Sequence, residues 1–203
     1  RSIWVTGVQT CALPICSYVM AHVHTNDAAI RCVNNGVRSL EHATLMEDDG
    51  VRAVVDHGAF VVPTLAIGDA IQELGPALGL PAVMMDKIRF LADQAYASLE
   101  RLRRAQAKIG FGTDLLGKVM DRQSREFVLR REIFSPLEIL RSATSVNAEL
   151  LQMSGKLGVI APDAFADLLV VDGNPLEDIA ILARPDSIRM ILKDGRIVHS
   201  SLH

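Results

Sequence analysis

The sequence lacks the features that mark several large classes of protein. Its three cysteines, Cys11, Cys16 and Cys32, are too few and too irregularly spaced for a disulfide framework or a cysteine-based zinc site. Its longest apolar runs, such as residues 60–67, are far shorter than the roughly 20 residues that cross a bilayer. The first residues lack the basic and then apolar pattern of a signal peptide. We therefore expect no membrane span. The compartment stays open, with the cytoplasm slightly favoured.

The sequence also lacks a large excess of charge of either sign. The formal net charge is −3 and the isoelectric point is about 6.1, so neither nucleic acid nor an acidic membrane surface is an expected partner. The 203 residues are 49% hydrophobic, which is enough for a substantial core. A globular chain is the class that remains.

The first sixteen residues have an unusual composition. Residues 5–15 read VTGVQTCALPI, which resembles the forward translation of a common short-read sequencing adaptor. A genuine strand with a turn at Gly7 and a break at Pro14 is the alternative. We expect residues 1–16 to be a non-native, adaptor-derived segment and family sequence to begin near Ser17, within a gene whose upstream part is absent.

From Ser17 the chain alternates between short apolar segments and amphipathic segments. Strands are predicted over residues 17–22, 37–42, 59–65 and 109–114, and helices over residues 25–36, 48–58 and 81–110. This alternation is typical of an α/β fold in which crossover helices join parallel strands. Ser135, Pro136 and Glu138 form a capping box that predicts another helix, to about Met153.

The pattern changes after Gly155. Short strands are predicted over residues 159–160, 166–171 and 189–198, with turns at residues 172–175 and at Asp194-Gly195. We therefore expect a first domain over residues 17–155 and a β-rich second domain over residues 156–203.

Three predicted strands end in a residue that metal chemistry can use: His22, His42 and Asp114. In parallel α/β folds, catalytic groups gather at the carboxyl ends of strands. His24 shares a face with His22, because side chains at alternate strand positions point the same way. Imidazole nitrogens and carboxylate oxygens bind zinc at roughly 2.0–2.2 Å. Spacing alone leaves two interpretations open, a metal site or hydrogen-bonded core and loop residues.

Several segments resemble successive strand ends of the amidohydrolase superfamily. They are Met20-Ala21-His22-Val23-His24-Thr25, Ser39-Leu40-Glu41-His42-Ala43-Thr44, Val62-Pro63-Thr64-Leu65 and residues 111–117. The branch they resemble most contains imidazolonepropionase-related proteins and Xaa-Pro or Xaa-Arg/Lys dipeptidases. Residues 155–158 and 166–175 are similar to that family's return into its small β-sandwich. The resemblance implies the C-terminal half of a (β/α)₈ TIM barrel, strands five to eight, followed by part of a β-sandwich.

The resemblance also implies roles for individual residues. His22 and His42 match metal ligands of the fifth and sixth barrel strands. Asp114 matches the eighth-strand aspartate, which touches the metal and shuttles a proton as the catalytic residue. His24 is a candidate to polarise the scissile carbonyl, and Arg122 could hold a substrate carboxylate with its guanidinium group. A plain loop histidine and a charged surface segment are the respective alternatives.

The implied function is hydrolysis of an amide bond in a dipeptide or N-acyl amino acid by a divalent metal enzyme, with zinc as the expected metal. Hydrolysis of a cyclic amide, or deamination, is the alternative on the same scaffold. The family's His-x-His pair and metal-bridging lysine have no counterpart here, so a third interpretation is an inactive fragment. Open strand edges at residues 17–21 and 109–113 would then favour pairing with another copy, so a homo-oligomer is also expected.

Overall fold

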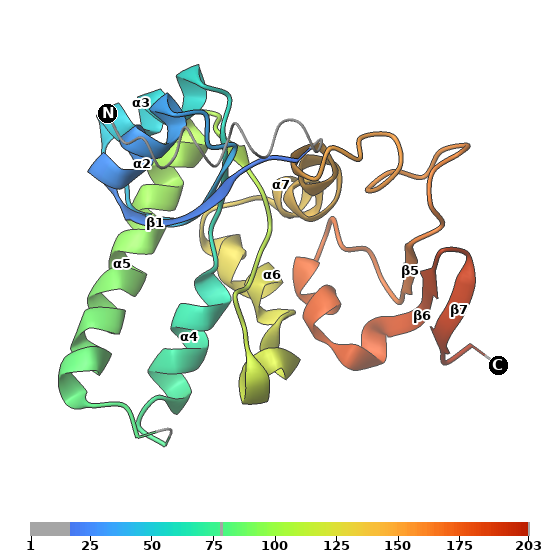
Figure 1. Cartoon of the computed structure of the whole chain (residues 1–203). Coiled ribbons are helices and arrows are strands. Elements are labelled where there is room, and N and C mark those ends of the chain that lie inside the picture. The colour runs from blue at the N-terminus through green and yellow to red at the C-terminus, as the bar shows by residue number, and fades with distance from the viewer. Residues whose placement is uncertain (1–16, 78, 203) are drawn as a thin grey trace. The chain divides into compact units, whose positions relative to one another are not determined.

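A computed structural model describes residues 17–77 and 79–202 (Figure 1). The predicted adaptor-derived segment, residues 1–16, lies outside the described residues. The chain divides into two compact units, of which the first ends at Asp114 and the second begins at Leu115. The domain boundary expected at residue 155 stays a prediction. Among the described residues, no helix is both long and apolar enough to cross a membrane.

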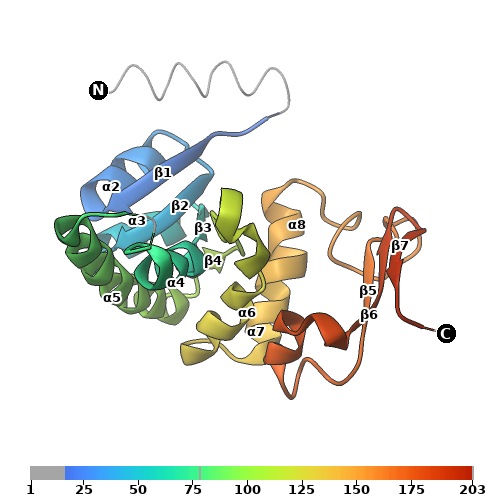
Figure 2. The same ribbon diagram turned by 90° about the horizontal axis from the view of Figure 1, so that it is seen from below.

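The first unit contains a four-stranded parallel sheet (Figure 2). Its strands lie side by side in chain order: β1 (Met20–Thr25), β2 (Ser39–Leu45), β3 (Phe60–Val62) and β4 (Lys108–Ile109). The predicted α/β class is confirmed. β1 and β4 form the two edges of the described sheet, as the sequence predicts.

The strand lengths differ from the predicted ones. β1 and β2 continue to Thr25 and Leu45, so His22 and His42 lie inside their strands and not at the last residue. β3 and β4 are shorter than predicted. β4 ends at Ile109, and the glycines at 110 and 112 that follow it are weak strand formers because they have no side chain to pack.

Helices connect the strands of the first unit. They are α2 (Asn26–Asn34), α3 (Asp48–Asp56), α4 (Leu65–Leu74) and α5 (Ala82–Arg104). α2, α3 and the start of α5 confirm the predicted helices. α5 ends at Arg104, before the predicted stop at Gly110, because Gln106 adopts a left-handed φ of 56°. α4 was not predicted; it packs side by side with α5 (Figure 1).

The core of the first unit lies between the sheet and its helices. Leu40, Phe60 and Val61 of the strands are fully buried, and Leu99 and Leu102 of α5 are 1% exposed. Near the start of α5, Met84 is 46% exposed, whereas its neighbour Met85 is buried. The contact between α5 and β2 brings this core directly beneath the histidine-bearing strand.

The second unit begins with short helices. They are η2 (Gly117–Arg122), α6 (Arg125–Leu129), η3 (Arg130–Glu132), α7 (Pro136–Arg141), η4 (Ser142–Val146) and α8 (Asn147–Leu150). The capping box is confirmed: the Ser135 hydroxyl accepts from the Glu138 amide, and the Glu138 carboxylate accepts from the Ser135 amide. The predicted helix to Met153 is interrupted by a π-helical turn, η4.

The second unit ends in a three-stranded antiparallel sheet, β5 (Leu168–Val171), β6 (Ile188–Lys193) and β7 (Arg196–Ser200). The short helices η5 (Ile179–Ala183) and η6 (Pro185–Ser187) precede β6. The predicted turn at Asp194-Gly195 joins β6 to β7, and both residues have positive φ. Residues 159–160, predicted as a strand, are irregular, and Ile160 is 91% exposed.

A buried ion pair lies within the helices of the second unit. Nε of Arg130 lies 2.7 Å from Oε1 of Glu126, and both side chains are almost completely buried. Arg130 also donates to the hydroxyl of Ser142, which donates to the carbonyl of Ile139. Ser142 is the first residue of η4, so this network connects α6 to the point where the helix changes from α to π.

Removing one partner of this buried pair is expected to destabilise the second unit. Glu126→Ala should lower its unfolding free energy by about 3–5 kcal/mol, because the Arg130 guanidinium would stay buried without the Glu126 carboxylate. The matched control is Glu100→Ala, which breaks an exposed i,i+4 pair with Arg104 and should cost less than about 1 kcal/mol. Native-state hydrogen exchange measures both; equal losses would contradict the interpretation.

Candidate metal centre

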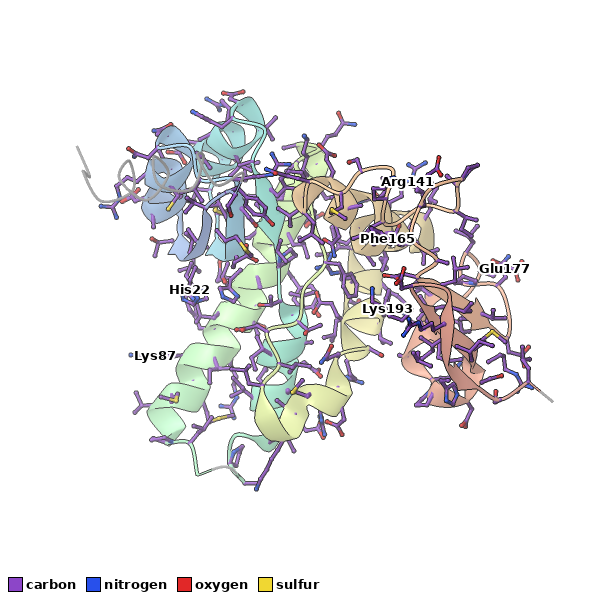
Figure 3. All side chains as sticks on the ribbon, turned by 45° about the vertical axis from the view of Figure 1, so that its right-hand side comes forward. His22, Lys87, Arg141, Phe165, Glu177 and Lys193 are labelled. Carbon is purple, nitrogen blue, oxygen red and sulfur yellow. The ribbon has the colours of Figure 1, made fainter. Side chains whose placement is uncertain are left out.

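Three histidine rings gather where β1 and β2 lie side by side. The ring centroids of His22 and His42 are 4.5 Å apart, those of His22 and His24 are 4.7 Å apart, and those of His24 and His42 are 5.0 Å apart. Figure 3 labels His22 on the first unit. Since β1 and β2 are parallel and in register, their histidines reach the same end of the sheet.

Two of the imidazole nitrogens face each other. Nδ1 of His22 lies 2.9 Å from Nε2 of His42. The remaining nitrogen of His42, Nδ1, is held by the hydroxyl of Thr64 at 2.7 Å, and Nδ1 of His24 is held by the hydroxyl of Thr44 at 2.8 Å. Each contact restrains the orientation of one ring, and the contact with His42 is of the kind that commonly lies behind a metal-binding histidine.

The backbone of β2 is distorted at His42. His42 and Ala43 both have positive φ, 75° and 48°, and the pairing with β1 shifts between Val23 and Thr25. Such a bulge redirects side chains near active sites, and each left-handed non-glycine residue costs about 1–3 kcal/mol. The distortion is therefore a feature that the surrounding packing must hold in place.

The buried hydroxyl of Ser98 on α5 holds the segment that follows the bulge. It donates to the carbonyl of Thr44 at 2.6 Å and accepts from the amide of Met46 at 2.8 Å. These bonds satisfy the carbonyl of Thr44 and the amide of Met46 where the strand pairing is shifted. The core helix thus holds the backbone of Thr44 and Met46, just after His42 in the chain.

Asp114 follows the last strand of the sheet in a left-handed conformation, with φ of 53°. Two residues earlier, Gly112 passes so close to β3 that an added Cβ would lie 2.6 Å from Cγ1 of Val62. Only glycine permits this approach. The Asp114 carboxylate is near enough to His24 and His42 to act on both of them electrostatically.

Burial lowers the pKa of both His24 and His42 below the ordinary histidine value. The positive charge that His22 can carry lowers the pKa of each further, and the negative charge of Asp114 acts in the opposite direction. Metal ligation requires neutral imidazole, so this shift favours the form that binds a metal.

Burial also raises the pKa of the Glu41 carboxyl. Glu41 accepts a 2.5 Å hydrogen bond from the fully buried Ser39, and it pairs in register with His22. The negative charge of Asp114 raises the pKa of Glu41 as well. Burial and the charge of Asp114 therefore both favour the protonated form of this carboxyl group.

The two facing nitrogens suit a shared metal ion. Their 2.9 Å separation is close to the roughly 3.3 Å expected between two nitrogens bound to tetrahedral zinc at about 2.0–2.1 Å. Within residues 17–77 and 79–202, however, no group of three or more His, Cys, Asp or Glu side chains is arranged to hold a metal. The described residues thus provide two converging donors, with a carboxylate nearby, and not a completed site.

The sequence predicted His22, His24, His42 and Asp114, and the geometry brings the three histidines together with Asp114 within electrostatic range. Arg122 lies at the end of η2 in the second unit, and its role as a carboxylate-binding residue stays a prediction. Thr44, Thr64, Glu41 and Ser98 were not predicted to contribute. Thr44 and Thr64 occur in strand-end segments, but only the fold reveals which ring each hydroxyl contacts.

The sequence of residues 15–198 matches the amidohydrolase family. A solved prolidase complexed with N-methylphosphonate-L-proline is 42% identical, with a TM-score of 0.93; the match covers 97% of this chain and 48% of that one. A solved Xaa-Pro dipeptidase with methionine bound in its active site is 29% identical, with a TM-score of 0.86 over 97% of this chain and 48% of that one. Ochratoxinase of Aspergillus niger is 26% identical over 181 residues, which cover 88% of this chain and 37% of that enzyme.

The parallel sheet and the crossover helices define the class as α/β. The chain belongs to the amidohydrolase family. It spans less than half the length of the three relatives named above.

The lowered histidine pKa values predict an acid-sensitive first unit. Below about pH 6.5 the unfolded histidines take up protons that the folded ones do not, so the stability should decrease as pH falls and level off above that value. Glu41 acts in the opposite direction. Its pKa is raised in the folded state, so the folded carboxyl takes up a proton at a higher pH than the unfolded one. Its contribution to stability therefore increases as the pH falls toward the pKa of the unfolded carboxyl.

The double substitution His24→Gln/His42→Gln isolates the histidine contribution. The free energy of unfolding, measured by urea unfolding, should fall less between about pH 7.5 and 5 in this variant than in the wild type. His57→Gln, at the exposed C-terminus of α3, is the control and should leave the pH dependence in place. The same pH dependence in the double variant as in the wild type would contradict the assignment.

Proposed function

We propose that this chain carries the C-terminal half of the active site of a metal-dependent amidohydrolase, which hydrolyses the amide bond of a dipeptide or N-acyl amino acid. The observation that carries the proposal is the 2.9 Å approach of His22 Nδ1 to His42 Nε2, with the Asp114 carboxylate close enough to act on His42. The proposed substrate class is supported by the 42% identity to a prolidase bound to a proline phosphonate.

In this proposal the four parallel strands are strands five to eight of a (β/α)₈ barrel, and β5, β6 and β7 belong to a small β-sandwich. The chain-order arrangement of β1 to β4 supports the first part, because neighbouring barrel strands follow one another in sequence. The TM-scores of 0.93 to the prolidase and 0.86 to the Xaa-Pro dipeptidase, both much longer chains, support the placement.

Zinc is the proposed metal, held by His22 through Nδ1, by His42 through Nε2 and by Asp114. This ligand set of nitrogen and carboxylate oxygen suits zinc. A bound divalent ion would lower the pKa of a water molecule toward about 7 and so make hydroxide available at neutral pH. Thr64 would keep His42 oriented through its contact with Nδ1.

The remaining chemistry belongs to side chains of this chain. Asp114 would take the proton of the attacking water and return it to the leaving amine. His24, which lies beside both ligand histidines, would donate a hydrogen bond to the scissile carbonyl oxygen and stabilise the charge that develops there. Arg122 would hold the substrate carboxylate through its guanidinium group.

The chain by itself is expected to bind zinc weakly and to show no turnover. The described residues bring together two facing nitrogens and a nearby carboxylate, and no group of three donors among them is arranged to hold a metal. Further ligands, which the family places on earlier barrel strands, would have to close the site.

Zinc titration by calorimetry tests the metal assignment in the chain as it is. His22→Ala and His42→Ala should each abolish detectable binding, because each removes one of two converging nitrogens. His199→Ala, on the exposed strand β7, is the matched control and should leave binding unchanged. Zinc binding that survives loss of either His22 or His42 would sink the assignment, and robust amide hydrolysis by the isolated chain would refute the incomplete-site interpretation.

Joining the chain to the N-terminal half of the related prolidase tests the reaction. The expected product is a zinc-dependent enzyme that cleaves Xaa-Pro dipeptides, and Asp114→Asn should lower its kcat by about 10²–10⁴-fold because the proton shuttle is lost. Chelation should abolish the activity and zinc should restore it. Hydrolysis of cyclic amides alone, or deamination alone, would overturn the dipeptidase assignment and favour the alternative chemistry.

A further inference from the structure

Two threonines make matching contacts with the histidine cluster. Thr44 of β2 contacts Nδ1 of His24 at 2.8 Å, and Thr64, directly before α4, contacts Nδ1 of His42 at 2.7 Å. The two rings are stacked with an interplanar angle of 17°. In a neutral imidazole one nitrogen carries the hydrogen, so the direction of each threonine contact determines what the opposite nitrogen, Nε2, can do.

Thr44 is buried, with 6% of its surface exposed. Among the described residues, the Thr44 hydroxyl has one hydrogen-bond partner, Nδ1 of His24. A buried hydroxyl hydrogen without an acceptor is costly, so a hydroxyl with a single partner is most stable when it donates to that partner. The Thr44 hydroxyl therefore donates to Nδ1, which leaves the hydrogen of His24 on Nε2.

Thr64 differs because it is only half-buried. Burial therefore does not oblige its hydroxyl to donate to the ring, and its oxygen can accept from Nδ1 of His42. Nε2 of His42 faces Nδ1 of His22 and needs an unprotonated lone pair to serve as a ligand. The hydrogen of His42 then lies on Nδ1, and Thr64 accepts it.

We propose that Thr44 and Thr64 are positioning residues whose hydrogen bonds run in opposite directions. Thr44 donates to Nδ1 of His24, so that Nε2–H of His24 is a hydrogen-bond donor. Thr64 accepts from Nδ1 of His42, so that Nε2 of His42 can be a metal ligand. This inference rests on the proposed function and deepens it. It assigns His24 to the substrate carbonyl and not to the metal, although its ring lies almost as close to His22 as that of His42 does.

The tautomer of His24 can be measured without metal. In the chain labelled with ¹⁵N-histidine, at a pH of about 8.5 where histidine is neutral, long-range proton–nitrogen correlations identify the protonated nitrogen. His24→Gln identifies the His24 signals among those of the six histidines. We expect hydrogen on Nε2 of His24. Hydrogen on Nδ1 would overturn the role of Thr44.

Substitutions at Thr44 test whether its hydroxyl is the cause. Thr44→Val keeps the shape but removes the donor, so a second His24 tautomer should appear, while Thr44→Ser should retain the wild-type tautomer. A His24 spectrum that is the same in Thr44→Val as in the wild type would contradict the proposal. The wild-type spectrum decides the question even if Thr44→Val does not fold.

The two threonines should differ in their effect on zinc. Thr64→Val should weaken zinc binding about 10–100-fold, as loss of a partner behind a ligand histidine does, and Thr64→Ser should restore it. Thr44→Val is the matched control and should change the zinc dissociation constant by less than about threefold, because His24 is not a ligand. Equal weakening by both valine variants would overturn the division of roles.

The outcomes separate this inference from the proposed function. If the wild-type chain binds no zinc at all, the proposed metal centre fails and the role of Thr64 fails with it. The metal-free spectrum of His24 still decides the role of Thr44. If zinc binds through His22 and His42 but Thr64→Val binds it as tightly as the wild type, the metal centre stands and the positioning role of Thr64 is wrong.

Discussion

The approach of His22 to His42 depends on how two parallel strands are paired. Register places Val23 opposite His42, and the bulge that follows displaces the pairing before Thr25 meets Leu45. Without the left-handed residues His42 and Ala43, a regular strand would send successive side chains to opposite faces of the sheet. The 2.9 Å contact between the rings is therefore a product of backbone distortion as much as of residue identity.

Contacts with α5 stabilise this distortion of β2. Ser98 of α5 hydrogen-bonds the backbone on both sides of Leu45, and the buried residues of β2 and α5 pack against each other. Gly112, which follows β4, lets the chain pass close to Val62 of β3 just before it reaches Asp114. Left-handed non-glycine conformations thus occur at His42 and Asp114, two of the three proposed ligands, as expected where packing maintains a strained active-site backbone.

Much of this arrangement could be predicted from the sequence, and the failures have physical reasons. Alternating strand and helix signals located β1, β2, α2 and α3, because hydrophobic periodicity and the glycines that end the helices are local properties. α4 was missed, since the apolar stretch up to Leu65 favours a strand and the helix that follows is stabilised by packing against α5. The π-helical turn at Ser142 was also missed, as it is tied to the buried network around Arg130 and has no local signal.

The candidate site shows the same division between local and long-range information. His22, His42 and Asp114 could be identified because each follows an apolar strand segment and matches a family motif. The partners that orient them could not be identified, because Thr64 and His42 are 22 residues apart and their contact exists only after the strands pair. Family membership supplies the chemical context, and the chain's own hydrogen bonds indicate which nitrogen of each ring is available.

The most direct test of the central claim is X-ray absorption at the zinc edge of the zinc-loaded chain. The account predicts two imidazole nitrogens together with carboxylate or water oxygens at about 2.0–2.2 Å, and loss of one imidazole in His22→Ala or His42→Ala. Zinc surrounded by oxygen alone, or an imidazole count unchanged by either substitution, would contradict the claim that these two strands share one metal ion.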